Sequence, residues 1–241
     1  MKKLLFILAL LPLGLQAQDT AEAVVGRYLR LLNSEALPAD SMLVVETTIS
    51  FHGLTDTMKM RRYYAPKGML RVEVSKGDTL LTGLCTNGTD RWREFARFTG
   101  WWGDITPADF ESKMQPYDPR GPLYDWKRHG ITLRYNGVTT YEGQRLQVVR
   151  AEQMDHYTRL YMFEEASGLL VVALDRNELP EGSFVPIISV KPVDYKIIHE
   201  YTPLGMMLLP TQESFLRDGL LTILESTAHL EARQNRLFNQ D

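Results

Sequence analysis

The sequence has a single cysteine, Cys85, among its 241 residues. One cysteine excludes an intramolecular disulfide and every metal site that is built from several thiolates. Cys85 lies in an apolar stretch, residues 81–86, which indicates a small buried hydrophobic side chain. The alternative interpretation is a reactive nucleophile.

The sequence also lacks a large excess of charge and the common catalytic motifs. It has 27 basic and 30 acidic side chains, a formal net charge of −3, which argues against nucleic-acid binding. Its five histidines show no zinc-motif spacing, and there is no Gly-x-Ser-x-Gly elbow or glycine-rich phosphate loop. We therefore expect a protein that is not an enzyme and holds no metal or cofactor.

A hydrolase stays open as a remote alternative. A serine or carboxylate can meet a histidine across neighbouring strands, and such a pair is invisible in one sequence. His156 and His199 are the first histidines to examine for such a partner.

The first residues have the layout of a secretory signal peptide. Lys2 and Lys3 precede an apolar run, residues 4–11, and Ala17 provides a small residue for cleavage. We expect residues 1–17 to be removed, leaving residues 18–241 as a single exported domain. The alternative is a membrane anchor, but the run is shorter than the roughly 20 residues that span a bilayer. No later stretch approaches that length, which predicts no stable membrane span after cleavage.

The rest of the chain reads as one leading helix followed by strands. Apolar residues at helical spacing predict an amphipathic helix from about residue 20 to residue 33. From residue 41 the apolar period changes to two, as in half-buried strands, and tight turns separate the runs. Strand runs are expected at 41–51, 57–64, 70–75, 79–86, 92–95, 131–135, 144–151, 157–164, 169–175, 192–202, 206–209, 212–217 and 220–231, for a total of about ten or eleven strands.

A helical insertion interrupts the strands between residues 100 and 130. Thr106 and Pro107 make a capped helix start, and Trp101 and Trp102 stand between two glycines just before it. The fold class is therefore α+β and mainly antiparallel β. A sheet of about ten to eleven strands must curl, split or close to hide its apolar face, and the amphipathic N-terminal helix can cover part of that face.

The order of these segments resembles the family of the periplasmic lipoprotein carrier LolA. Residues 88–92 resemble a glycine turn followed four residues later by tryptophan, and residues 141–146 resemble a glycine-led strand after the helical excursion. Residues 164–169 resemble a hairpin leading to an apolar strand, and residues 224–238 resemble the closing strand and tail. The pattern spans roughly residues 20 to 240. An Arg-Pro pair of the well-studied members is absent, because Tyr63 follows Arg62 here, which is typical of a divergent member.

The resemblance implies a lipid- or lipoprotein-binding carrier, or chaperone, of the Gram-negative periplasm. It also implies a strongly curved, incomplete β-barrel, covered by the N-terminal helix and the mid-chain insertion. The apolar cavity of this half-barrel would hold acyl chains or the lipidated terminus of a protein. Membrane-bound donor and acceptor proteins would be its partners. The alternative is a structural or lipid-sensing interaction module whose core is filled.

The inner lining of such a cavity can be assigned from the strand alternation. The expected lining residues are Leu43, Val45, Ile49, Phe51, Met58, Met60, Leu70, Val72, Val74, Leu160 and Met162. Methionines are flexible and polarizable, so they suit a site that accepts variable apolar shapes. They also fill irregular cores, and this alternative stays open.

The insertion supplies a candidate lid made of Trp101, Trp102 and Phe110. The tryptophans could form a hinged lid or a foot that touches a membrane, or a core plug that seals the half-barrel. Arg61, Arg62 and Arg71 are expected to form a solvated strand face or, alternatively, to contact lipid headgroups or an acidic partner. By the resemblance, Arg62 is the candidate polar group at the entrance.

Overall fold

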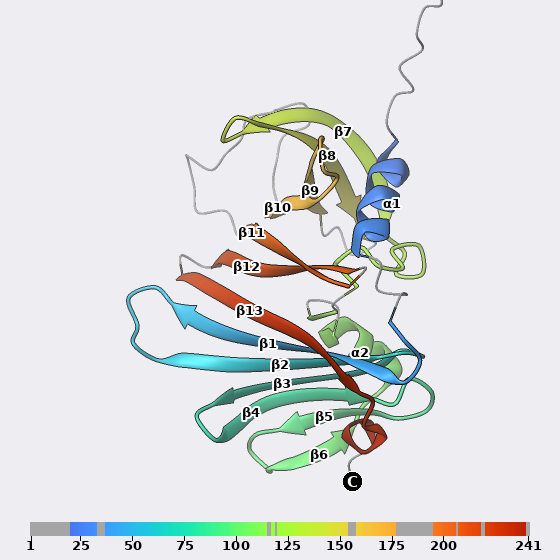
Figure 1. Cartoon of the computed structure of the whole chain (residues 1–241), viewed down its shortest axis with the longest axis vertical. Coiled ribbons are helices and arrows are strands. Elements are labelled where there is room, and N and C mark those ends of the chain that lie inside the picture. Colours follow the sequence, from blue (N-terminus) through green and yellow to red (C-terminus); the bar gives the residue numbers. More distant parts are fainter. Residues whose placement is uncertain are drawn as a thin grey trace, which may run out of the picture.

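A computed structural model shows one antiparallel sheet that coils around two helices. It describes residues 20–32, 37–114, 117–118, 120–153, 158–176, 195–205, 207–217 and 220–239. The thirteen strands lie in the order β6-β5-β4-β3-β2-β1-β13-β12-β11-β10-β9-β8-β7 (Figure 1). The end strands β6 and β7 do not pair with each other, so the described sheet is an incomplete barrel, as predicted. The predicted signal peptide lies outside the described residues.

The helices and strands follow one another in a meander with one helical interruption. Their bounds are α1 Ala21–Leu32, β1 Ser41–Phe51, β2 Thr57–Ala65, β3 Met69–Lys76, β4 Thr79–Thr86, β5 Trp92–Ala96, β6 Trp101–Asp104, α2 Pro107–Met114, β7 Thr132–Tyr141, β8 Gln144–Glu152, β9 Thr158–Glu164, β10 Leu170–Arg176, β11 Tyr195–Leu204, β12 Met207–Arg217, β13 Leu220–Ala232 and η3 Asn235–Phe238.

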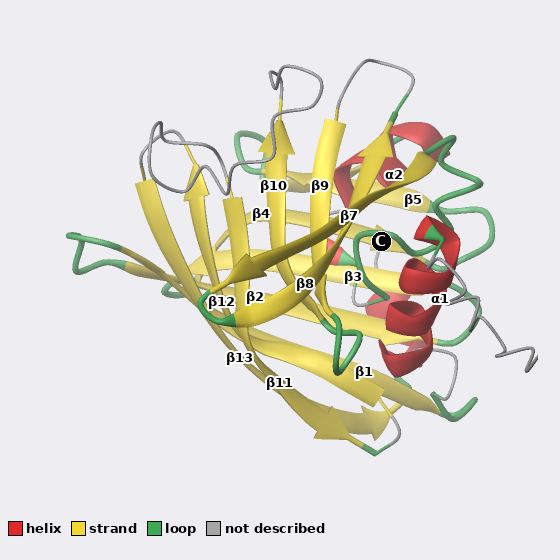
Figure 2. Ribbon diagram, turned by 90° about the horizontal axis from the view of Figure 1, so that it is seen from above, coloured by secondary structure: helices red, strands yellow, loops and turns green. Residues whose placement is uncertain are grey.

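Both α-helices lie on one face of the sheet, here called the inner face (Figure 2). The Thr20 hydroxyl accepts a hydrogen bond from the Ala23 backbone N–H (3.2 Å) and caps α1. The apolar stripe of α1, which includes Val24, Val25 and Tyr28, is fully buried against β7–β11. Helix α2 covers the β1–β4 half of the same face.

The opposite face, the outer face, is covered at β1–β4 by the C-terminal 3-10 helix η3. Phe238 packs there against Met42 and Val44, which alternate with the inward-facing residues of β1. Arg71 is only 4% exposed, and its guanidinium donates a hydrogen bond to the Leu237 carbonyl (2.7 Å). The chain end is therefore fastened to the middle of the sheet.

The structure has more strands than the ten or eleven that were predicted. Residues 101–104 form a strand, β6, where the start of the helical excursion was expected. Asn136 and Gly137, a dipeptide typical of hairpin turns, form an irregularity within β7, because the pairing with β8 resumes at Val138. By contrast, the same dipeptide at Asn87 and Gly88 does connect two strands, β4 and β5.

Candidate functional site

The inner face of β1–β4 brings most of the predicted lining residues together. Leu43, Val45, Met60, Leu70 and Val72 are all buried in one cluster, and Ile49 and Val74 pack partly buried against it. The register pairs Met58 with Ile49, so Met58 shares this face. The alternation along β1 gives Phe51 the same direction. One apolar surface thus runs across three neighbouring strands, as the strand periodicity predicted.

Leu160 and Met162 do not belong to that surface. They lie on β9 and pack with Leu146, Val148 and Val172 on the face opposite α1. Their neighbours Tyr161 and Phe163 are the residues of β9 that contact α1. The sequence alternation was correct, but it could not tell which of two equally apolar faces is the inner one.

The predicted lid is also divided between the two faces. Phe110 of α2 is buried on the inner face with Met114. Trp102 instead packs on the outer face, where its ring fills the space that a side chain at position 83 would occupy. Trp101 is 75% exposed. The structure therefore does not place the tryptophans over the lining residues, and Phe110 with Met114 is the plug.

The three arginines that were expected to form one solvated strand face separate in the structure. Arg61 is exposed and pairs with Glu46 (2.7 Å) on the outer face. Arg71 is buried under the C-terminal turn. Arg62 points to the inner face, because it pairs in register with Val45 and Val72. Successive residues of a strand face opposite ways, which already separates Arg61 from Arg62.

Arg62 lies in a charged centre beneath α1. It donates a hydrogen bond to the Thr47 hydroxyl (3.3 Å), and desolvation lowers its pKa while the nearby Glu213 carboxylate opposes that shift. Glu213 is 2% exposed and forms an ion pair with Lys196. A cavity of about 50 Å³ remains between this centre and α1, enough for one or two water molecules. The inner face is thus nearly filled beneath α1, whereas a pocket of about 140 Å³ remains beside Leu70, Phe110 and Met114.

Helix α1 is held over this centre by two buried tyrosines. Tyr28 packs on Phe163 with ring centroids 5.4 Å apart and is hydrogen bonded to Tyr201. The Tyr201 hydroxyl donates to the Leu170 carbonyl (2.8 Å). Burial raises the pKa of both tyrosines well above the ordinary value of 10.0, so both stay neutral.

The structure also places one of the histidines suggested for a hydrolase beside a serine. The Nε2 atom of His199 lies 2.8 Å from the Ser214 hydroxyl oxygen. Among the described residues, no carboxylate contacts the other ring nitrogen of His199, so the pair lacks the orienting acid of a catalytic triad. His156 lies outside the described residues.

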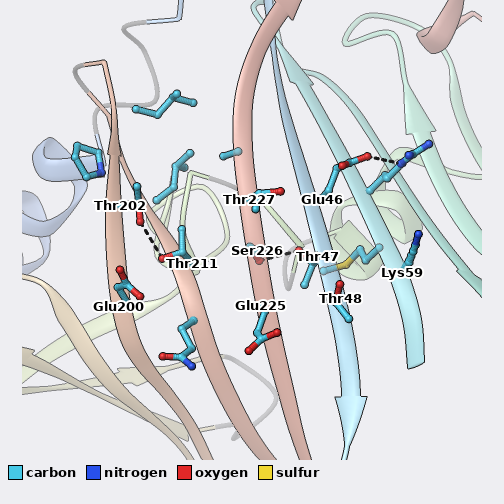
Figure 3. Close-up of a pocket in the computed structure, with 17 residues that line it drawn as sticks. Glu46, Thr47, Thr48, Lys59, Glu200, Thr202, Thr211, Glu225, Ser226 and Thr227 are labelled. Carbon is cyan, nitrogen blue, oxygen red and sulfur yellow. Dashed lines mark hydrogen bonds and ion pairs between the residues drawn. The ribbon is translucent and has the colours of Figure 1, made fainter. Parts of the chain in front are cut away.

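Sequence reasoning missed a cleft where β12 and β13 separate. The two strands pair only from Gln212 with Glu225 to Arg217 with Leu220, and the rest of each strand diverges. The resulting cleft has a volume of about 730 Å³ (Figure 3). It is lined by Glu46, Thr47, Thr48, Lys59, Met60, Arg61, Glu200, Thr202, Pro203, Leu204, Leu209, Thr211, Gln212, Glu225, Ser226, Thr227 and Ala228.

Two β-bulges explain the divergence. The register between β11 and β12 skips His199 on one strand and Thr211 on the other. A bulge bends its strand and increases its twist, and Pro210, next to the second bulge, has no N–H to donate to a neighbour. The proline was visible in the sequence and led to two predicted strands, 206–209 and 212–217, where the structure has the single strand β12.

The fold can now be compared with known proteins. No protein-family model matches the sequence, and no curated protein matches it significantly. Among solved structures, a LolA superfamily protein from Nitrosomonas europaea aligns over 92% of this chain and 98% of its own, with a TM-score of 0.58 and 10% identity. A DUF1329 family protein from Desulfovibrio piger gives the same coverage and TM-score at 12% identity.

A third structure, a putative outer membrane lipoprotein-sorting protein domain from Vibrio parahaemolyticus, aligns with a TM-score of 0.51. It covers 89% of this chain and 91% of its own, at 10% identity. This chain has the fold of the LolA superfamily. At such low identity the similarity establishes the fold alone.

No described helix is both long and apolar enough to cross a membrane. Within the same residues, no three histidine, cysteine, aspartate or glutamate side chains are grouped so that they could hold a metal ion.

Proposed function

We propose that this protein is a periplasmic carrier, or chaperone, that binds an acyl chain or the lipidated terminus of a protein on its inner face. The observation that carries the proposal is the apolar surface across β1–β3, interrupted by Arg62 and Thr47, which the chain covers with a short, separate helix rather than with another layer of sheet. The LolA-superfamily fold supports the same interpretation. In this proposal the protein binds its ligand and catalyses no reaction.

Binding of an acyl chain would replace α2 as the apolar partner of the lining residues. In the described state Phe110 and Met114 cover the lining residues. An acyl chain that displaces α2 and buries about 300 Å² of its own apolar surface gains about 7 kcal/mol, at about 25 cal/mol per Å². For loading to be favourable, that gain has to exceed the cost of uncovering Phe110 and Met114 when α2, a helix of eight residues, moves.

The charged centre offers a binding site for the polar end of the ligand. Arg62 and Lys196 are the two cations on the inner face beside the lining residue Val45. We propose that the Arg62 guanidinium holds the polar end of the ligand, since Arg62 stands at the boundary between the apolar lining and the charged centre. This is the polar entrance that the resemblance implied.

The carrier proposal also includes a location and partners for the protein. An N-terminal segment with the layout of a signal peptide supports export, and removal of residues 1–17 would leave the carrier in the periplasm. Membrane-bound donor and acceptor proteins would load and unload it.

Uptake of a fluorescent fatty acid by delipidated protein tests this function. We expect one saturable site, lost in Met60→Glu because a carboxylate on the lining repels an acyl chain. Met60→Gln adds no charge and keeps the test usable if the glutamate variant fails to fold. Leu54→Glu is the matched control, because Leu54 is 61% exposed on a turn.

The alternative is an interaction module with a filled core, which the nearly complete filling of the inner face beneath α1 favours. Absence of uptake by the folded wild-type protein would support that alternative and reject the carrier. Equal uptake by Met60→Glu and wild type would place the ligand somewhere other than the inner face.

A further inference from the structure

The cleft between β12 and β13 exposes two strand edges that face each other within one sheet. Beyond the last pair, Gln212 with Glu225, β12 continues through Met207–Thr211 and β13 through Ser226–Ala232. β12 stays paired with β11, and β13 stays paired with β1, on the sides away from the cleft. No described residue forms a ladder with the sides that face the cleft. Figure 1 shows the two strands diverging.

Unpaired edges of this kind present hydrogen-bonding groups at strand spacing. In an antiparallel ladder, alternate residues direct their backbone N–H and C=O groups to opposite neighbours. Every second residue of β13 from Ser226 to Ala232 therefore offers a donor and an acceptor to the cleft. Such edges pair readily with an extended chain. The seven residues of this edge are about 23 Å long, at about 3.3 Å per residue.

The cleft has the alternating walls that an inserted strand needs. On the inner side lie Leu209, which is 4% exposed, and Ala228. Further along the same edge, Leu230 is 42% exposed, although its cross-strand partner Leu43 is buried. An incoming strand with an apolar residue at every second position would cover this inner side.

The outer side carries unpaired negative charge. Glu200 and Glu225 flank Gln212 in one row across β11, β12 and β13, and Figure 3 shows the two carboxylates on either side of that strand. Both are exposed, and neither forms an ion pair with another described residue. The one other carboxylate of the cleft, Glu46, is already paired with Arg61. The outward positions of an inserted strand would therefore favour lysine or arginine.

We propose that this cleft binds an extended segment of a partner polypeptide, which adds a strand between β12 and β13 and alternates apolar with basic residues. The cleft shares Met60 and Leu209 with the inner face, but its proposed ligand is a protein segment rather than a lipid. The proposal goes beyond the proposed function and does not depend on it.

The test uses a fluorescent eight-residue peptide, in which valine alternates with lysine, and the full-length protein. We expect saturable binding and slowed amide hydrogen exchange at 226–232 and 207–211. A peptide of the same sequence with alternate backbone nitrogens methylated keeps the side chains but removes donors along one edge. It should bind at least tenfold more weakly, because strand addition depends on those N–H groups.

A charge-reversed protein provides the second arm. The double variant Glu200→Lys, Glu225→Lys changes exposed side chains only, so it should fold normally. We expect it to weaken binding of the lysine peptide about tenfold at low salt, and the difference should shrink in 0.5 M NaCl. The matched control is Asp78→Lys with Glu142→Lys, which reverses two exposed charges in turns remote from the cleft.

Three results would overturn the proposal. The first is no peptide binding by a protein that is folded. The second is protection at the end strands β6 or β7 instead of at β12 and β13. The third is slowed exchange at the cleft caused by a fatty acid but not by the peptide, which would make the cleft a lipid site. Fatty-acid uptake at the inner face is measured separately, so its failure is distinguishable from failure here.

Discussion

Arg71 provides a buried polar contact between the sheet and the C-terminal turn, whose Phe238 also packs on the sheet. Besides the Leu237 carbonyl, its guanidinium pairs with Glu73 and lies 4.8 Å from the centroid of the Trp102 ring. Arg71→Ala leaves that carbonyl and the Glu73 carboxylate without their buried partner. We expect a loss of about 3 kcal/mol in the free energy of unfolding, measured by urea titration. Arg236→Ala removes an exposed arginine of the same terminal turn and should change little. Equal effects of the two variants would contradict the role given to Arg71.

Gly88 is required by a close approach as well as by its backbone angle. Its φ is +80°, and a Cβ atom would lie 2.1 Å from the Lys67 carbonyl oxygen. Gly137 has a similar φ, +90°, but a Cβ there meets nothing within 4 Å. We expect Gly88→Ala to destabilise the protein by about 2 kcal/mol more than Gly137→Ala, measured as the difference in unfolding free energy. A smaller cost at Gly88 would show that its turn adapts freely.

Individual side-chain roles were the least predictable part of the sequence. Strand periodicity correctly grouped Leu43, Val45 and Met60, because one face of a strand shares one environment. It could not show that Arg71 is buried, since the partner that justifies its burial comes from residue 237. Long-range polar contacts of this kind leave no local pattern.

Helix α2 acts as the plug of the apolar lining. Phe110 is 3% exposed and packs against the lining cluster. Phe110→Ala should destabilise the protein by about 3 kcal/mol and leave a cavity on the inner face. If α2 competes with the ligand for this face, the variant should also bind the fluorescent fatty acid more tightly than wild type. Unchanged or weaker uptake, in a variant that remains folded, would contradict competition between plug and ligand.

At the scale of elements, the sequence predicted most strands and both helices but not the divergence of β12 from β13. Pro210 marked an interruption, and the sequence interpretation placed a strand boundary there. The structure instead continues the strand through a bulge at Thr211 and bends it away from β13. Bulges depend on the pairing of two strands, so one strand's sequence does not determine them.

For the molecule as a whole, buried tyrosines make stability sensitive to high pH. Burial raises the pKa of Tyr28, Tyr63, Tyr64 and Tyr201 above 10.0, the value they regain on unfolding. Below pH 10 both states hold these protons, and the stabilising contribution is complete. Above pH 10 the unfolded state ionises first, so the free energy of unfolding should fall as the pH rises, by up to about 1.4 kcal/mol per pH unit for the fully buried Tyr28.

Urea titrations at pH 9, 10 and 11 measure this dependence. Tyr28→Phe removes one ionisable group. Above pH 10 the free energy of unfolding of this variant should therefore fall less steeply with pH, by the contribution of about one proton. An identical slope in the variant would show that Tyr28 does not contribute to the pH dependence.

The most direct test of the carrier proposal is native mass spectrometry of the protein purified from cells, combined with lipid extraction. We expect a stoichiometric mass excess that organic extraction removes and identifies as acyl lipid. The Met60→Glu protein, purified in the same way, should lack that mass. A wild-type protein that is reproducibly free of lipid, and that takes up no fatty acid after purification, would contradict the proposal.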